Sequence, residues 1–220
     1  MKRFLLFAAA AIVAIATNAQ VADVDDDFEE SGIVDRRTSA VHLGVRVGAN
    51  ISTMSKYNMV DLGQKSGIGF EGGLVLSARF GKRTLSSDAG TGMFGVQIEP
   101  SYVQRTIGTD YENIKLSYFE IPVLFKIYVT PNVNIEVGPN IAGTLSSNPD
   151  FIDAVGTRIA TGDIKGFDIK ACLGVSYEMK EGLYASLRYN LGTSDLAGNF
   201  PCKVSGASLT IGYKFNIFKF

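Results

Sequence analysis

The sequence contains a single histidine, His42, which limits the chemistry that the chain could do. A serine or cysteine nucleophile needs a base and a group that orients the base. His42 has no serine or aspartate beside it on the same face of its segment, so we interpret it as structural. We therefore expect no catalytic, cofactor-binding or metal-binding residues, no cofactor and no enzymatic activity.

Charged residues are the richest source of chemistry in the chain. Six acids and seven bases share the polar face of the alternating segments described below: Glu71, Glu99, Glu120, Glu136, Asp168 and Glu178, with Arg46, Arg79, Arg105, Lys126, Lys170, Arg188 and Lys214. Buried charges are costly unless they are paired, so this balance favours a salt-bridged interior. A narrow ion or proton path lined by the same groups is the alternative.

A second group of carboxylates lies near the N-terminus. Seven acidic residues fall between Asp23 and Asp35. Such a run is normally solvated and disordered, and the ligand spacing of an EF-hand calcium loop is absent. Removing residues 1–35, which hold two basic and seven acidic residues, leaves 19 basic and 15 acidic residues, a net charge of +4.

The two cysteines, Cys172 and Cys202, are too few for a disulfide scaffold. We expect Cys172 to point to the inside of the fold and Cys202 to lie beside the last long loop. Whether the two thiols pair stays open at this point.

The N-terminus has the features of a secretory signal peptide. Lys2 and Arg3 precede an apolar run of 13 residues from Phe4 to Ala16, and small residues follow. The run is too short to span a membrane as a helix, and we predict cleavage before Gln20. We therefore divide the chain into a signal peptide (1–19), an acidic disordered segment (20–40) and one folded domain (41–220).

Composition excludes several classes of protein. The 220 residues are 46% hydrophobic and 10% aromatic, with a formal net charge of −1. The chain is too apolar for a disordered protein, and it lacks the basic field that nucleic acid requires.

Apolar residues recur with a period of two in most of residues 41–220, as in half-buried strands. Eight such segments are present: 41–51, 67–80, 94–105, 118–129, 133–141, 167–178, 183–191 and 206–215. One face of each segment is rich in Phe, Ile, Val and Leu, and the other carries Gly, Ser, Asn and the paired charges. Such strands suit a small barrel with a crowded polar lumen and an apolar surface in lipid. We predict an all-β, eight-stranded antiparallel up-and-down transmembrane barrel.

The connectors agree with this architecture. Those at 52–66, 106–115, 145–165 and 193–203 are long, as outer loops are, whereas 130–132 and 179–182 are short turns. Residues 81–92 form a turn that is longer than expected. Pro100, Pro122 and Pro139 lie inside strands, where we expect β-bulges to accommodate them.

The turn Thr130-Pro131-Asn132 also predicts a register. It places Val129 opposite Val133 and, counting outward, Lys126 opposite Glu136 on the lumen face. The last strand, near Thr210 to Ile217, has the spacing of an outer-membrane assembly signal, so we expect the barrel-assembly machinery to be a partner.

Six segments resemble the PorT-like outer-membrane β-barrel family of Bacteroidota-type bacteria. They are VRVGANIS (45–52), QIEPSYVQRTIG (97–108), SYFEIPVLFKIYV (117–129), VGPNIAG (137–143), LRYNLG (187–192) and LTIGYKF (209–215). The resemblance covers about residues 41–220 and implies an eight-stranded outer-membrane barrel. Most members have no assigned activity, and the family takes its name from a member associated with a protein secretion system.

Three functions fit these features. The first is a non-enzymatic barrel of the bacterial outer membrane, with both termini in the periplasm and outer loops that bind a partner in the envelope or a secretion system. The second is a narrow pore for small solutes. The third is a secreted soluble barrel that binds a lipophilic ligand.

Overall fold

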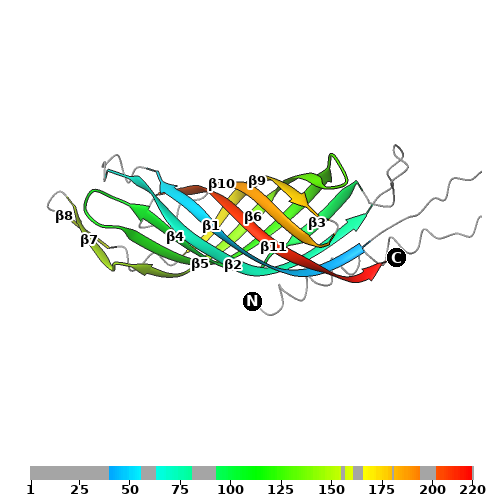
Figure 1. The fold of residues 1–220 in the computed structure, drawn as a ribbon. Helices are drawn as coiled ribbons and strands as arrows, with labels where there is room; N and C mark the ends of the chain where they lie inside the picture. The colour runs from blue at the N-terminus through cyan, green and yellow to red at the C-terminus, as the bar shows by residue number, and fades with distance from the viewer. Residues whose placement is uncertain are drawn as a thin grey trace, which may run out of the picture.

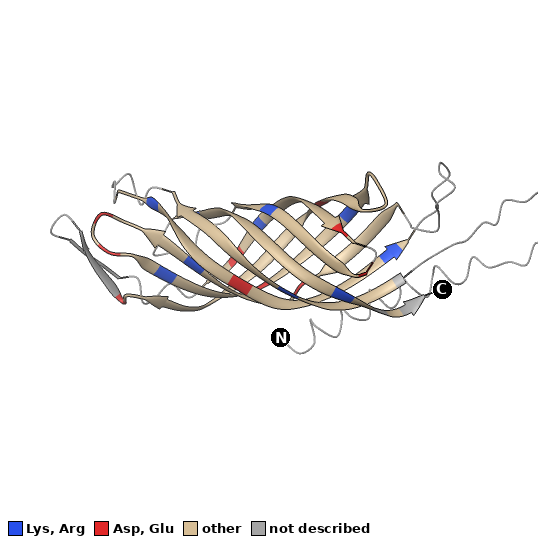
Figure 2. Cartoon of the chain, in the orientation of Figure 1, with Lys and Arg blue, Asp and Glu red and all other residues tan. Residues whose placement is uncertain are grey.

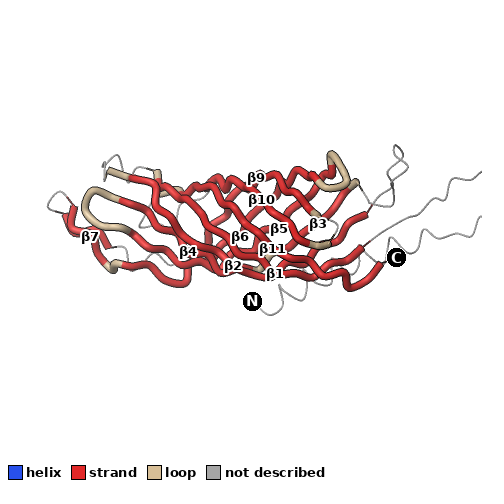
Figure 3. Tube along the Cα trace, viewed as in Figure 1, coloured by secondary structure: helices blue, strands red, loops and turns tan. Residues whose placement is uncertain are grey.

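The described part of the chain contains eleven strands in a computed structural model (Figures 1 and 3). The structure describes residues 40–55, 63–80, 93–154, 157–160, 166–179, 181–193 and 202–219. The predicted signal peptide and acidic segment lie outside these residues. No helix in the described part of the chain has the length and apolar character needed to cross a membrane.

Nine of the strands form one closed wall, and the other two form a separate hairpin. The wall strands are β1 (Ala40–Met54), β2 (Lys65–Phe80), β3 (Phe94–Ile98), β4 (Ser101–Gly108), β5 (Ile114–Tyr128), β6 (Val133–Asn148), β9 (Phe167–Glu178), β10 (Leu183–Gly192) and β11 (Val204–Lys219). β3 and β4 are two halves of one long strand, interrupted at Glu99 and Pro100. The hairpin comprises β7 (Phe151–Ala154) and β8 (Thr157–Ala160).

The wall is an eight-stranded antiparallel barrel, as predicted. Each strand pairs with its neighbours in sequence, and β1 closes the barrel by pairing with both β2 and β11. The start of β1 and the end of β11 lie at one end with the short turns, and the β7–β8 hairpin lies at the other (Figure 1). We call these the turn end and the loop end.

The strands are strongly staggered around the barrel. Following paired residues from Leu173 in one direction leads to Val41, and in the other direction to Ile51. These two residues are ten positions apart on β1, which is the shear of the barrel. A stagger of this kind tilts the strands by roughly 35–45° to the barrel axis. Side chains at one height therefore come from very different positions along their strands.

Side chains alternate between the lumen and the outer surface with the predicted assignment. In β10 every second residue from Tyr184 to Gly192 is buried, whereas the residues between them are exposed. Leu43, Val45, Phe125, Leu187, Leu209 and Phe215 are among the large apolar side chains on the outer surface. This arrangement is the reverse of a soluble barrel and disagrees with the soluble, ligand-binding alternative.

The strands are longer at the loop end than predicted, and their outward residues become polar there. β4 and β5 extend into the expected loop 106–115, and β6 continues to Asn148. Exposed or half-exposed polar residues form a ring beyond the apolar surface: Thr53, Ser66, Thr106, Lys115, Ser117, Lys203 and Ser205. The apolar surface that faces lipid therefore ends before the strands do.

The prediction of β-bulges at the three prolines was wrong. Register is unchanged across Pro100, Pro122 and Pro139. The carbonyl of Pro100 accepts a hydrogen bond from the Leu74 amide at 3.0 Å, and that of Pro122 accepts one from the Glu99 amide at 3.1 Å. Opposed residues normally exchange two such bonds, and proline lacks the N–H for the second. The wall thus accommodates these prolines by omitting hydrogen bonds rather than by adding residues.

Leu187→Arg should lower the free energy of unfolding by about 2–4 kcal/mol, because this outward side chain is 60% exposed on the apolar surface, where a charge must enter hydrocarbon. Urea unfolding in phospholipid vesicles measures the change. Thr53→Arg, in the outward polar ring, is the matched control and should cost less than about 1 kcal/mol. Equal losses would place the polar ring inside the hydrocarbon.

Candidate functional site in the barrel lumen

The lumen contains the charged residues that the sequence analysis assigned to it. Eleven of the thirteen are buried, and Glu178 and Arg79 are partly buried near the turn end. Acidic and basic positions are interspersed along the wall rather than separated into two halves (Figure 2). This distribution allows each charge to find an opposite one nearby.

Eight of these side chains form one continuous chain of alternating sign. Its order is Lys214, Glu178, Lys126, Glu136, Arg188, Glu99, Arg46 and Glu71. The first link joins Lys214 Nζ to Glu178 Oε1 at 2.7 Å. The last link joins Arg46 Nη1 to Glu71 Oε1 at 2.9 Å. Four acids and four bases leave this chain with no net charge.

The link between Arg188 and Glu99 crosses the lumen. Arg188 on β10 binds both carboxylate oxygens of Glu99, with 2.8 Å between Nη2 and Oε1. β10 lies four strands from the β3–β4 strand in either direction around the barrel. Side chains from opposite walls are therefore in contact, and the lumen at this height is filled by protein.

A second group of four charges lies closer to the loop end. Arg105 donates two or more hydrogen bonds to Glu120, at 3.0–3.1 Å. Lys170 Nζ lies 2.9 Å from Glu120 Oε1 and 3.4 Å from Asp168 Oδ2. Asn140 donates a further hydrogen bond to Glu120 at 2.7 Å. This group also contains two acids and two bases.

The predicted pair between Lys126 and Glu136 is confirmed. The two residues are opposite each other in the β5–β6 ladder, and Lys126 Nζ lies 2.8 Å from Glu136 Oε1. The pair is not isolated, however, because Lys126 also binds Glu178 and Glu136 also binds Arg188. Removing Glu136 would therefore not leave Lys126 without a carboxylate.

Aromatic rings complete the environment of the lysines. Lys214 Nζ lies 4.6 Å from the centre of the Tyr184 ring, and Lys170 Nζ lies 4.4 Å from that of Tyr118. A ring face attracts a cation and stabilises it most where water is excluded. The alternation predicts both tyrosines on the inward face of their strands, but the sequence analysis did not predict their contacts with the lysines.

The seventh base, Arg79, lies at the turn end. Its guanidinium stacks 3.5 Å from the centre of the Tyr128 ring and donates to the Pro131 carbonyl at 3.2 Å. His42 is at the same end of the barrel, half-buried near the start of β1. The described residues contain no group of three or more metal-binding side chains.

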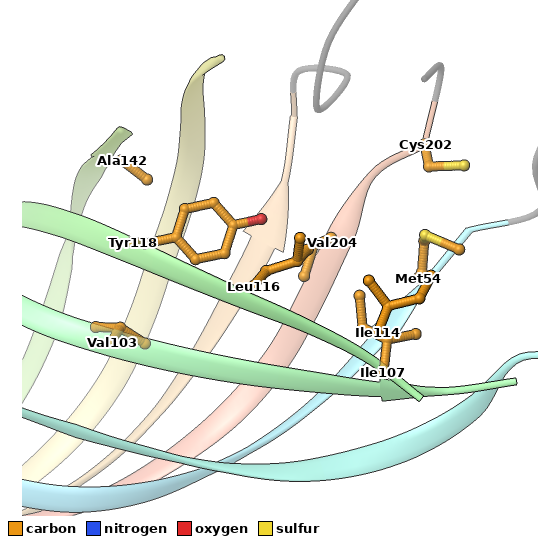
Figure 4. Packing of buried hydrophobic residues seen from close by; sticks show 9 residues of the cluster. All are labelled: Met54, Val103, Ile107, Ile114, Leu116, Tyr118, Ala142, Cys202 and Val204. Carbon is orange, nitrogen blue, oxygen red and sulfur yellow. The ribbon is translucent and has the colours of Figure 1, made fainter. Parts of the chain in front are cut away.

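An apolar layer fills the lumen at the loop end, which the sequence analysis did not predict. Nine buried residues form it: Met54, Val103, Ile107, Ile114, Leu116, Tyr118, Ala142, Cys202 and Val204 (Figure 4). Ile107, Ile114 and Leu116 are completely buried. They lie in residues 106–117, which were assigned mostly to a loop. The signal was available, because Ile107 continues the inward parity of Arg105.

Cys172 and Cys202 are both buried and do not form a disulfide with each other. Cys172 faces the lumen in the middle of β9, whereas Cys202 belongs to the apolar layer beside β11. Both positions agree with those expected from the sequence.

Two double variants test whether stability depends on the order of the ion pairs in the alternating chain or only on the number of charges in the lumen. Lys126→Met with Glu136→Met leaves fragments of two and four charges, each neutral, and should unfold within about 1 kcal/mol of the wild type. Glu136→Met with Arg188→Met leaves fragments with net charges of +1 and −1, and should be destabilised by about 3–5 kcal/mol.

Urea unfolding in the same vesicles measures both variants. Each removes one acid and one base, so total charge is matched between them. Equal stability of the two variants would contradict the arrangement of the chain.

Comparison with known proteins agrees with this architecture. A family model described as "Outer membrane protein beta-barrel domain" matches residues 19–198. Among curated proteins, no significant match was found.

Several solved structures are similar at low sequence identity. The attachment invasion locus protein of Yersinia pestis is 14% identical with a TM-score of 0.45, and the match covers 82% of this chain and 99% of that one. Neisserial surface protein A is 15% identical with a TM-score of 0.44, covering 79% and 97%. OprG of Pseudomonas aeruginosa is 13% identical with a TM-score of 0.35, covering 82% and 97%.

The family match spans most of the chain, and the structure has the closed barrel, the apolar outer surface and the ion-paired lumen of a membrane-embedded barrel. The chain belongs to the outer membrane protein beta-barrel domain family and is an eight-stranded barrel of the outer membrane.

Proposed function

We propose that this protein is a sealed, non-enzymatic outer-membrane barrel whose outer loops bind a partner in the cell envelope. The observation that carries the proposal is the double closure of the lumen. Charged side chains from opposite walls meet at mid-height, and an apolar layer lies between them and the loop end.

The double closure argues against the alternative of a small-solute pore. An ion path needs groups that bind and release the ion, and water that accompanies it. Here each inward carboxylate binds a lysine or an arginine of the wall. A hydrated ion would also have to pass Ile107, Ile114 and Leu116, whose hydrocarbon side chains cannot replace its water.

The same pairing supports a non-enzymatic role. General acid–base catalysis needs a titrating group within reach of a substrate. The inward carboxylates are held by cations, and His42 lies at the turn end, away from the loops. Catalytic, cofactor-binding and metal-binding residues are accordingly not assigned.

We place both termini in the periplasm, after cleavage of a signal peptide at residues 1–19 and with residues 20–40 as a disordered acidic segment. The short turns from β5 to β6 and from β9 to β10 lie at one end, and the longest connection, from β6 to β9, lies at the other, which supports this orientation. We also propose that β11 is the strand read by the barrel-assembly machinery. β11 closes the barrel against β1, so its insertion completes the wall.

The loops are then the main surface left for function. The connection from β6 to β9 is long enough to form its own hairpin, β7–β8. We propose that this end contacts an envelope partner, and the resemblance to the PorT-like family favours a partner in protein secretion. Replacing residues 150–165 with a short turn should abolish that role while the barrel still folds.

The test compares a deletion strain complemented with the wild type or with the shortened loop. Release of the cell's own secreted proteins into the medium is the readout, and barrel assembly is checked by the faster migration of unheated protein on a denaturing gel. Normal release from the deletion strain itself would end the secretion proposal.

Orientation can be tested with a matched pair of exposed residues. Glu112→Cys at the loop end should react with a membrane-impermeant maleimide on intact cells, whereas Glu181→Cys at the turn end should react only after lysis. The wild type is the background, because Cys172 and Cys202 are 2% and 0% exposed. The opposite labelling pattern would show that the turn end, rather than the loop end, faces the outside of the cell.

Purified protein should give no stepwise conductance in planar lipid bilayers. Ile107→Ala with Leu116→Ala should also fail to conduct, because the ion-paired section remains filled. Conductance steps from correctly folded wild type would favour the pore instead.

A further inference from the structure

Six outward polar side chains form a compact patch on the loop-end part of β4, β5 and β6. They are Gln104, Thr106, Lys115, Ser117, Ser146 and Asn148, and we call them the outer polar patch. We propose that this patch binds the phosphorylated sugar headgroup of a membrane glycolipid, which approaches from the side of the barrel.

The register places these six residues in two rows of three. Gln104 pairs with Ser117, which pairs with Ser146. In the second row, Thr106 pairs with Lys115, which pairs with Asn148. Directly opposed residues have Cβ atoms about 4.5–5.5 Å apart, so the rows make a continuous surface of hydroxyl, amide and ammonium groups.

The patch faces sideways rather than into the lumen. Its members alternate along the strands with Arg105, Ile107, Ile114 and Leu116, which are completely buried inside. At the height of Ile107, Ile114 and Leu116 the wall is apolar inside and polar outside, the reverse of its arrangement toward the turn end. These outward side chains therefore lie in a polar medium beside the membrane.

The residues directly below the patch face lipid. Tyr102 and Phe70 are outward and exposed, with ring centres 6.0 Å apart. The Tyr102 hydroxyl donates a hydrogen bond to Ser117 Oγ at 3.0 Å, linking the aromatic pair to the patch. Tyrosine at the edge of an apolar surface is typical of a membrane interface. A molecule on the patch could thus keep its acyl chains against these rings.

The charge of the patch favours a phosphate. Lys115 is exposed, and none of the residues described in the structure forms an ion pair with it. The exposed ion pair of Lys65 with Asp110, at 2.7 Å, is neutral as a whole. One lysine amid amides and hydroxyls can bind a phosphate oxygen while its neighbours bind sugar hydroxyls.

This proposal rests on the proposed orientation, which puts the patch in the leaflet at the cell surface. The binding test uses purified protein in detergent, so it does not depend on orientation, and the cysteine labelling tests orientation alone.

Native mass spectrometry with added diphosphorylated lipid A measures binding. Lys115→Gln should weaken it about tenfold, as expected for one charge-assisted hydrogen bond. Gln104→Leu should weaken it by about threefold through loss of a neutral hydrogen bond. The matched control is Lys203→Gln, an exposed lysine next to β11 whose backbone pairs with Ser55, and it should change binding by less than about twofold.

Four further results test the site and its ligand. Equal losses in the two lysine variants, or equal binding of lipid A without phosphates, would overturn the site. Equal binding of phosphatidylglycerol would show that the patch does not recognise the sugar, which would contradict the proposal. Equal competition by soluble glucosamine 1-phosphate would show a site for free anions rather than for a lipid. Heat-modifiable migration confirms that each variant is folded.

Discussion

The requirement that every charge in a narrow, water-poor lumen meets an opposite charge shapes the rest of this barrel. An eight-stranded wall leaves room only for side chains, so arginines and lysines from one wall reach carboxylates of the other. Burial of an unpaired charge is prohibitive, whereas a paired and hydrogen-bonded one is tolerated. The alternating chain meets this condition only because the shear of ten positions brings Glu99, Arg188 and Glu136 to one height. The positions of the charged residues in the sequence are thus matched to the shear of the barrel.

Polarity along the barrel axis separates two environments. From the turn end to the middle of the barrel, the strands carry charged residues inside and apolar residues outside. The apolar outer surface is what contact with hydrocarbon requires. At the loop end Met54, Ile107 and Leu116 turn inward and Thr53, Thr106 and Ser117 turn outward, as in a small soluble barrel. One strand can satisfy both media because its period of two is kept while the two faces exchange character.

Much of this could be predicted from the sequence, and the failures have physical causes. Alternation alone predicted eight strands and their faces, and a three-residue turn was enough to predict that Lys126 meets Glu136. The partners of Glu99 and Glu120 could not be predicted, because they depend on the shear and on which walls face each other. The apolar layer was missed because its residues lie where the outward residues become polar. The pattern of apolar outside and polar inside, on which the strand prediction relied, is lost there although the strands continue.

The bulges expected at the prolines failed for a different reason. We expected each proline to shift the register of its strand through a β-bulge. Instead the register is kept, and one inter-strand hydrogen bond is absent at Pro100 and at Pro122. Nothing in the local sequence tells these two solutions apart.

Pro100 and Pro122 lie on adjacent strands, and each removes one rung of the ladder on the same stretch of wall. The barrel is therefore mechanically uneven around its circumference. Its seam between β1 and β11 keeps one register over thirteen residue pairs, from His42 to Met54, whereas the section from β2 to β5 has a local deficit of inter-strand bonds. Deformation of the wall, whether thermal or imposed by a neighbouring molecule in the membrane, will concentrate there. The seam that joins the first and last strands is thus not the weakest line of the barrel.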